Sequence, residues 1–119
     1  MTRYNKELGK TGEEAAVKYL IKNGYSILAT NYRCRSGEID IVAREGEFLV
    51  FIEVKTRTGT RYGSASEALD IRKKQRLRKL ANYYLMMKGL TDVNCRFDVV
   101  TLQLADNTNW ELELFRNAF

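Results

Sequence analysis

The chain of 119 residues is 45% hydrophobic and 29% charged, an ordinary composition for one soluble globular domain that needs no disulfide or metal to fold. Its net charge of +5 favours an anionic partner. The sequence contains no histidine, which excludes a histidine general base, a histidine-ligated zinc and a Ser-His-Asp triad.

The two cysteines, Cys34 and Cys95, lie far apart among strand-forming residues. They cannot form a structural zinc site, and we interpret them as reduced core thiols of a protein from a reducing compartment. Any metal would be held by oxygen ligands, which favours Mg²⁺ or Mn²⁺. Because no signal peptide and no apolar run of about 18 residues is recognisable, we expect a cytoplasmic protein without membrane contact.

The hydrophobic periodicity predicts six elements along the chain. In chain order they are a helix (5–25), a strand (25–34), a two-stranded hairpin (37–57), a long helix (64–90), a strand (95–104) and a short edge strand (109–115). Asn23-Gly24 stops the first helix, Gly46 supplies a hairpin turn at residues 44–47, and Ser64 with Glu67 forms a capping box. This order predicts an α/β fold with a mixed central sheet flanked by helices, in a single domain over residues 1–119.

The second strand of the hairpin carries charges at its end. Its even-numbered face is apolar throughout, whereas the opposite face begins with Leu49 and Phe51 and continues with Glu53, Lys55 and Arg57. One face is therefore core along its whole length, and the other becomes polar in its last third, as expected for a strand that ends in a cleft.

The first strand of the hairpin carries two more carboxylates. Glu38 and Asp40 share one face, and the opposite, apolar face holds Ile39, Ile41 and Ala43. Counting outward from a turn at residues 44–47 puts Asp40 beside residues 50–51 and Glu38 beside residues 52–53. The pairing therefore predicts that three carboxylates and Lys55 converge on one patch.

Two interpretations of this patch stay open. Two like charges about 4 Å apart repel by about 4 kcal/mol at an effective dielectric near 20, and a divalent cation between them removes that repulsion. Alternatively, Lys55 and Arg57 neutralise Glu53 and Asp40 as ordinary surface ion pairs. The core-like surroundings favour the cation, because unpaired ions are costly there.

The two helices add further candidates. Glu13 lies on the inward stripe of the first helix, where a glutamate is also a common partner of the helix dipole. The long helix carries a basic run that is either a solvated face or a phosphate-binding surface, and within it Lys73 faces the sheet, four residues before Leu77. Asp98, on the strand predicted at residues 95–104, is interpreted as structural or as a supporting residue.

Gly37-Glu38-Ile39-Asp40, followed by a strand ending in Glu53-Val54-Lys55, resembles the signature of the PD-(D/E)XK nucleases. The αβββαβ order is the restriction-endonuclease-like core of that superfamily. Over nearly the whole chain the sequence is more closely similar to the YraN family of small bacterial endonuclease-like proteins, through the segments GEEAAVKYL, NYRCRSGEIDIV, LVFIEVKTR and RFDVV and the K-x-x-x-L motif at Lys73. It also resembles archaeal Holliday junction resolvases, in which a glutamate stands seven residues before a leucine, as Glu13 does before Leu20.

The resemblance implies a role for each matching residue. Asp40, Glu53 and the Val54 carbonyl would hold Mg²⁺ or Mn²⁺, with Glu38 as an outer ligand. Lys55 would orient or deprotonate the attacking water, and Glu13 would complete the site through water or a second ion. The residues expected to contact nucleic acid are Arg57, Lys73, Lys74 and Arg76. The likeness to the resolvases is compatible with a homodimer.

Three functions follow as hypotheses. The first is a metal-dependent nuclease that hydrolyses phosphodiester bonds in DNA, including branched or single-stranded structures. The second is a nucleic-acid-binding module that keeps the fold without cleaving. The third is a scaffold whose acidic cluster is a vestige. Retention of Asp40, Glu53 and Lys55 together favours the first, because two carboxylates would repel a phosphate unless a cation lay between them.

Overall fold

The computed structural model describes residues 3–57, 71–104 and 109–119, with side chains from residue 11 onward except that of residue 57. The elements are α1 (Arg3–Lys22), β1 (Ser26–Cys34), β2 (Gly37–Glu45), β3 (Phe48–Arg57), α2 (Ile71–Met87), β4 (Asn94–Leu104) and β5 (Trp110–Phe115). The predicted start of the long helix, with its Ser64–Glu67 capping box, lies outside the described residues. No helix in the described ranges is long and apolar enough to cross a membrane.

The strands form one five-stranded sheet in the order β1-β2-β3-β4-β5. All neighbours pair antiparallel except β3 and β4, which run parallel because α2 lies between them in the chain and returns it to the same end of the sheet. The mixed sheet with two helices confirms the predicted α/β class and the αβββαβ order. The short strand at the C-terminal end pairs only with β4, so it is an edge strand as predicted.

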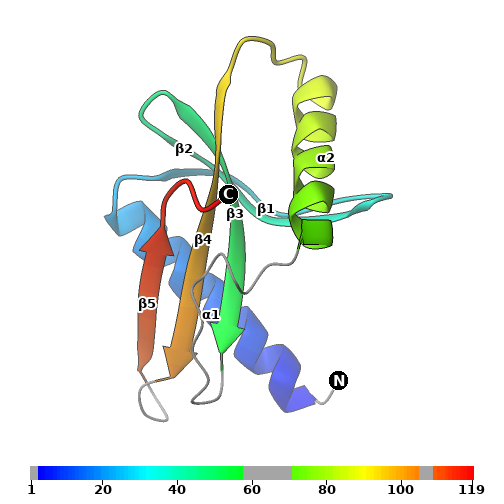
Figure 1. Cartoon of the computed structure of the whole chain (residues 1–119). Helices are drawn as coiled ribbons and strands as arrows, with labels where there is room; N and C mark the ends of the chain where they lie inside the picture. The colour runs from blue at the N-terminus through cyan, green and yellow to red at the C-terminus, as the bar shows by residue number, and fades with distance from the viewer. Residues whose placement is uncertain (1–2, 58–70, 105–108) are drawn as a thin grey trace.

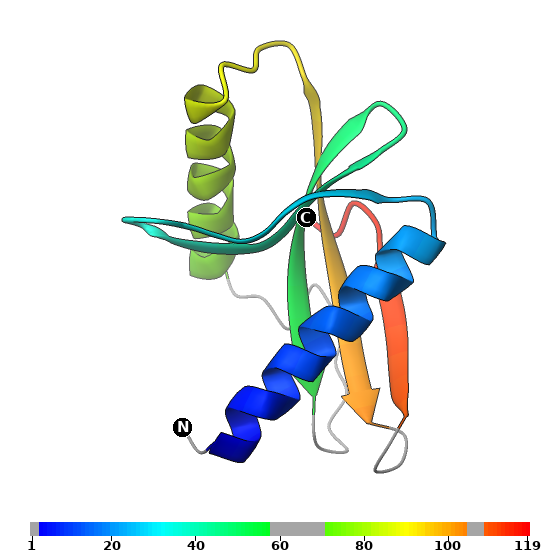
Figure 2. The same ribbon diagram turned by 180° about the vertical axis from the view of Figure 1, so that it is seen from behind.

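The helices cover opposite faces of the sheet (Figures 1 and 2). Ala16 and Leu20 of α1 pack on alternate residues of β3, Val50 and Ile52. The intervening residues of β3, Leu49 and Phe51, pack instead under α2, against Leu77, Leu80, Ala81 and Tyr84. The alternation of β3 therefore divides the core into two layers, and it places Glu53 on the α2 side together with Phe51.

The predicted turn at residues 44–47 is too long by two residues, both at its N-terminal end. Glu45 pairs with Phe48, so the turn consists of Gly46 and Glu47 alone, with Gly46 at a φ of 58°. The register consequently pairs Ile41 with Ile52, about two to three residues away from the predicted pairing. This shift places Asp40 next to Glu53 and Val54, rather than next to residues 50–51.

The expected common face of Ile39, Ile41 and Ala43 is also wrong. Ile39 packs in the α2 layer, whereas Ile41 and Ala43 pack in the α1 layer. The pairing of β2 with β3 stops at Ile41, and beyond it the β1–β2 ribbon turns away from β3 toward α2 (Figure 2). A strand that twists strongly at one point changes the face of the residues on either side of it.

Asp98 lies on the α1 side of β4, on the opposite face from Glu53, and is fully buried. Its two oxygens accept hydrogen bonds from the Tyr25 hydroxyl at 2.6 Å, from Nε and an Nη of Arg96 at 2.8 Å, and from the backbone N–H of Asn117 at 2.9 Å. Arg96 also pairs with Glu45, whose pKa is lowered to about 2 by its hydrogen bonds to Arg116 and Arg96. The charge of Asp98 is therefore compensated, and its role is structural.

The Asp98 network predicts a large loss of stability on a small change. Asp98→Asn replaces an acceptor oxygen with an NH₂ donor that faces N–H and O–H donors, so we expect the free energy of unfolding to fall by about 3–5 kcal/mol. Tyr25→Phe, which removes the hydroxyl that donates to Asp98 and accepts from Arg96, should cost about 1–3 kcal/mol. Urea denaturation followed by circular dichroism measures both. A loss below about 1 kcal/mol for Asp98→Asn would show that the network is not a compensated buried charge.

Candidate metal and active site

The carboxylate of Asp40 accepts a backbone hydrogen bond from β3 that a carbonyl of β2 would accept in a continued ladder. Counting from the tight turn, the N–H of Val54 points toward β2, but pairing with β2 has already ended at Ile41 and Ile52. The N–H donates instead to Oδ2 of Asp40 at 2.8 Å. An otherwise unpaired backbone donor in a core strand would cost about 1–3 kcal/mol, so this hydrogen bond also fixes the carboxylate against β3.

Glu53 reaches the same place from the α2 side of the sheet. It is only 7% exposed, and its Oε1 lies 2.6 Å from Nζ of Lys73 in α2. In this structure, which holds no nucleic acid, Lys73 pairs with the buried carboxylate, and its expected contact with phosphate stays a prediction. A carboxylate with so little solvent access requires such a partner or a bound cation.

The two carboxylates are close enough to change each other's protonation. Burial and the neighbouring charge of Glu53 raise the pKa of Asp40 to about 7, against the opposing effect of the Val54 N–H. A hydrogen bond between Asp40 and Glu53 and the charge of Glu13 act in the same direction. Near neutral pH, without a metal, the pair therefore retains a proton that two isolated carboxylates would have lost.

Two lysines complete the cluster. Burial and the ammonium of Lys73 lower the pKa of Lys55, while the carboxylates Glu53 and Asp40 oppose that change. Burial also lowers the pKa of Lys73, but its hydrogen bond and ion pair with Glu53 outweigh burial, so the pKa of Lys73 lies above its ordinary value. Of the two, Lys55 is therefore the one whose neutral form is more accessible.

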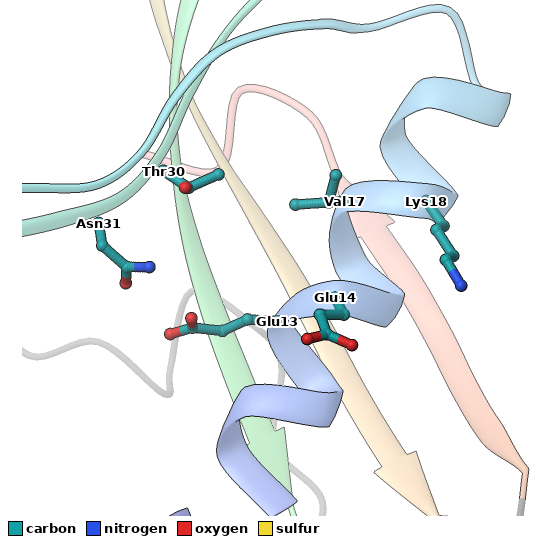
Figure 3. Close-up of a pocket in the computed structure, with 6 residues that line it drawn as sticks. All are labelled: Glu13, Glu14, Val17, Lys18, Thr30 and Asn31. Carbon is teal, nitrogen blue, oxygen red and sulfur yellow. The ribbon is translucent and has the colours of Figure 1, made fainter. Parts of the chain in front are cut away.

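Glu13 approaches from α1. Its side chain is partly buried and projects from the helix toward β3, and its charge contributes to the raised pKa of Asp40 (Figure 3). The end of the β2–β3 pairing thus receives Glu13 from the α1 side, Glu53 and Lys55 from the α2 side, and Asp40 from the neighbouring strand.

Other predicted site residues lie apart from this cluster. Glu38 pairs with Arg33 at 3.3 Å in the β1–β2 ribbon. Nζ of Lys74 lies 5.9 Å from the ring centroid of Phe119, and Arg76 is exposed on α2. Arg57 belongs to β3, and its side chain is outside the described part of the chain.

The donor set fits a hard divalent cation with few protein ligands. Among the described residues, no three Asp, Glu, Cys or His side chains stand close enough to hold one ion together. Asp40 and Glu53 nevertheless face each other, and their mutual repulsion is reflected in the pKa of Asp40. Mg²⁺ often binds through one or two carboxylates and completes its coordination with water and substrate phosphate, so the two acids suit this ion.

Two features of the site were not predicted from the sequence. Lys73 was assigned to the sheet-facing side of its helix, but nothing in the sequence indicated that Glu53 is its partner. Asn31 adopts a φ of 51° in the middle of β1. Its neighbours Thr30 and Tyr32 pair with Ile41 and Ile39, so Asn31 stands across from Asp40. Asparagine tolerates this conformation, but its presence in a strand-like segment gives no sign of it.

Comparison with known proteins identifies relatives over the whole chain. A model of the family described as "Uncharacterised protein family UPF0102" matches residues 12–102. A UPF0102 protein of Pelotomaculum thermopropionicum is 49% identical over 120 residues, which cover 100% of both chains. One from Moorella thermoacetica is 52% identical over 104 residues and 87% of each chain. One from Symbiobacterium thermophilum is 45% identical over 115 residues, which cover 97% of this chain and 98% of the relative.

The raised pKa of Asp40 predicts a pH-dependent stability in the absence of metal. An unfolded aspartate loses its proton near pH 4, whereas Asp40 in the fold keeps it up to about pH 7. The stability contributed by this proton is therefore complete below pH 4 and is lost as the pH rises to about 7. In EDTA, the wild type should lose stability over this range, and Asp40→Asn, which still accepts from Val54, should lose less.

Urea denaturation at pH 4, 5, 6, 7 and 8 measures this difference, and Glu47→Gln, at the exposed hairpin turn, is the control that should follow the wild type. Added Mn²⁺ at pH 8 should stabilise the wild type and leave Asp40→Asn unchanged. Parallel pH curves for wild type and Asp40→Asn would contradict the crowding of Asp40 and Glu53.

The ion pair of Lys73 with Glu53 predicts a competition with metal. Lys73→Met removes the positive charge and keeps the length of the side chain, so Glu53 should gain more from a cation. We expect the Kd for Mn²⁺, measured by calorimetry, to fall about tenfold, equivalent to about 1.4 kcal/mol. Lys74→Met, one residue along α2, should leave the Kd unchanged. Weaker binding by Lys73→Met would show that Lys73 supports the metal rather than replacing it.

Proposed function

The chain belongs to the UPF0102 family, and we propose that it is a metal-dependent nuclease that hydrolyses phosphodiester bonds in DNA. The observation that carries the proposal is the forced proximity of Asp40 and Glu53, each from a different strand, beside Lys55. A binding surface for an anionic polymer has no use for two adjacent acids, one buried and one half-buried, that repel phosphate. A hydrolytic centre uses them to hold a cation at the phosphate.

In this proposal Asp40 and Glu53 hold Mg²⁺ or Mn²⁺, with the Val54 carbonyl as the third protein oxygen. The ion, when bound, supplies Lewis-acid stabilisation of charge on the phosphate and lowers the pKa of water. With an ion held there, Lys73 would no longer be needed by Glu53, and its ammonium would be available to a phosphate oxygen of the substrate. Together with loss of the proton held at Asp40, this exchange would keep the net charge of the acidic pair and its partners nearly constant.

Lys55 performs the proton chemistry in the absence of histidine. Because burial and Lys73 lower its pKa, its neutral form is more accessible than that of an exposed lysine, and Nζ can accept a proton from water. As an ammonium it donates hydrogen bonds to the phosphate as negative charge develops there. Glu13, whose charge acts on Asp40, would orient water on the α1 side.

A second candidate function is a nucleic-acid-binding module that does not cleave, and one observation favours it. The ion pair of 2.6 Å between Lys73 and Glu53, together with the proton held at Asp40, neutralises the acids without any cation. A site neutralised in this way can persist in a protein that only binds DNA. The two candidates differ in whether a divalent ion displaces Lys73.

Cleavage of end-labelled single-stranded, duplex and four-way-junction DNA, in Mg²⁺, Mn²⁺ or EDTA, tests the proposal. Wild-type protein should cleave at least one of these in either metal and none in EDTA. Glu53→Gln should reduce the rate at least about a thousandfold, and Lys55→Met at least about 10²-fold, since it removes both the proton transfer and the hydrogen bonds to the phosphate. Glu47→Gln, far from the cluster, should cleave at the wild-type rate.

Three outcomes would contradict the proposal. DNA binding without cleavage of any substrate, unchanged by Glu53→Gln, would establish the binding module. Cleavage that survives Glu53→Gln and Asp40→Asn would place the chemistry elsewhere or in a contaminating enzyme. Absence of both binding and cleavage would leave the scaffold hypothesis, which a protein pull-down addresses.

A further inference from the structure

A cavity lies beside the acidic cluster on the α1 side of the sheet. It has a volume of about 360 Å³, is open to solvent, and is lined by Glu13, Glu14, Val17, Lys18, Thr30 and Asn31. Figure 3 shows Val17 and Thr30 directed toward each other across it, while the Lys18 ammonium points away. Cavities of this size, combining apolar wall with a few polar groups, are typical of small-ligand sites.

Two residues connect the cavity to the proposed hydrolytic centre. Glu13 lines the cavity and also acts on the pKa of Asp40. Asn31 lines the cavity and stands across from Asp40 in the β1–β2 pairing. A polymer whose phosphate lies at Asp40 and Glu53 would therefore have an adjacent unit at the mouth of the cavity.

Asn31 is held in a conformation that most residues avoid. Its φ of 51° lies in the left-handed region, although residues on both sides of it are paired in β1. Such a residue costs roughly 1 kcal/mol or more, and it persists where the fold or a function requires it. The consequence here is that a carboxamide, with both donor and acceptor, is presented at the cavity.

We propose that this cavity receives the base of an unpaired nucleotide adjacent to the phosphate that is cut. The inference rests on the proposed function and deepens it, because it makes the substrate single-stranded or locally unpaired. A base in a duplex is stacked and paired, and must leave the helix to enter a pocket. A strand that is already unpaired enters without that cost.

The charges of the cavity select a base over a phosphate. Glu13 and Glu14 repel phosphate groups, whereas a neutral base presents N–H groups whose hydrogen bonds the carboxylates can accept. Asn31 offers a donor and an acceptor to the Watson–Crick edge, and Val17 supplies an apolar contact for the ring. The phosphates of the nucleic acid would contact Lys55 and Lys73 on the α2 side. The nucleic-acid strand would therefore pass between the α1 side and the α2 side of the site.

A strand with one abasic position tests the inference. Binding of a labelled 12-nucleotide single strand is measured by fluorescence anisotropy in Ca²⁺, so that affinity is read without dependence on cleavage. For the wild type, an abasic residue at one register should weaken binding about tenfold, since contacts to one base contribute on this scale. Val17→Phe, which fills the cavity, should weaken binding of the intact strand similarly and make it insensitive to the abasic position.

Asn31→Gly gives a second variant that keeps the backbone, because glycine adopts a positive φ without strain. It should lower affinity for the single strand and reduce any difference among bases. Asn117→Gly is its matched control, since Asn117 has a φ of 53° and lies at the Asp98 network. Ile21→Phe, one turn beyond Val17 and exposed, is the control for added aromatic volume. Both controls should bind as the wild type does.

The inference and the proposed function fail in different ways. Base-dependent binding with no cleavage in Mg²⁺ or Mn²⁺ would refute the nuclease and keep the cavity as a base site. Cleavage that is indifferent to abasic residues at every position and to Val17→Phe would refute the cavity alone. Displacement of the strand by a free nucleoside monophosphate at micromolar concentration would make the cavity a mononucleotide site, and would overturn its assignment to a nucleic-acid strand.

Discussion

The hydrogen bond from the Val54 N–H to Asp40 fixes the geometry on which the site depends. It forms where β2 stops pairing with β3, and the carboxylate replaces the carbonyl that a continued ladder would have supplied. The satisfaction of one buried donor thereby holds Asp40 against the strand that carries Glu53. The Val54 N–H gains a hydrogen-bond acceptor. As a consequence, Asp40 and Glu53 lie close together in a poorly solvated position.

The protein resolves that conflict with charge from two sources. Lys73 neutralises Glu53 directly, and a proton shared near neutral pH lowers the charge of Asp40. A divalent cation would replace both at once, since one ion carries the charge of the ammonium and of the proton. Metal binding is therefore expected to be linked to proton release and to movement of a side chain of α2, and under the proposed function the state of the site would depend on pH, on metal and on nearby phosphate together.

The sequence predicted the elements well, because their signals are local. The alternation of β3 assigned Val50 and Ile52 to one layer and Leu49 and Phe51 to the other, and the structure confirms both assignments. The register of the hairpin was wrong because the turn is two residues shorter than predicted, which shifts every partner, and hydrophobic alternation does not report turn length. The change of face at Ile39 was missed because hydrophobic alternation does not report where the pairing of β2 with β3 ends.

The partners within the site were harder to predict than its members. Asp40, Glu53 and Lys55 were recognisable as charges in otherwise apolar strands, but the pairing of Glu53 with Lys73 joins two elements through a contact that no local pattern encodes. The conformation of Asn31, opposite Asp40 where the pairing of β2 with β3 has ended, is likewise not encoded in a local pattern. Sequence patterns thus identify residues that are unusual for their element, whereas the fold decides what they face.

The two helices have separate tasks at one site. The α2 layer carries the cations that balance the acids, Lys55 and Lys73, while the α1 layer carries Glu13 and the cavity. Residues from both layers act on Asp40 where the pairing of β2 with β3 ends, so one irregularity in the sheet brings groups from either face to one carboxylate. Because Glu13 belongs to both the cavity and the acidic cluster, occupation of the cavity by a base would alter the charge environment of Asp40. Substrate selection and chemistry would then be coupled through one side chain of α1, without any movement of the sheet.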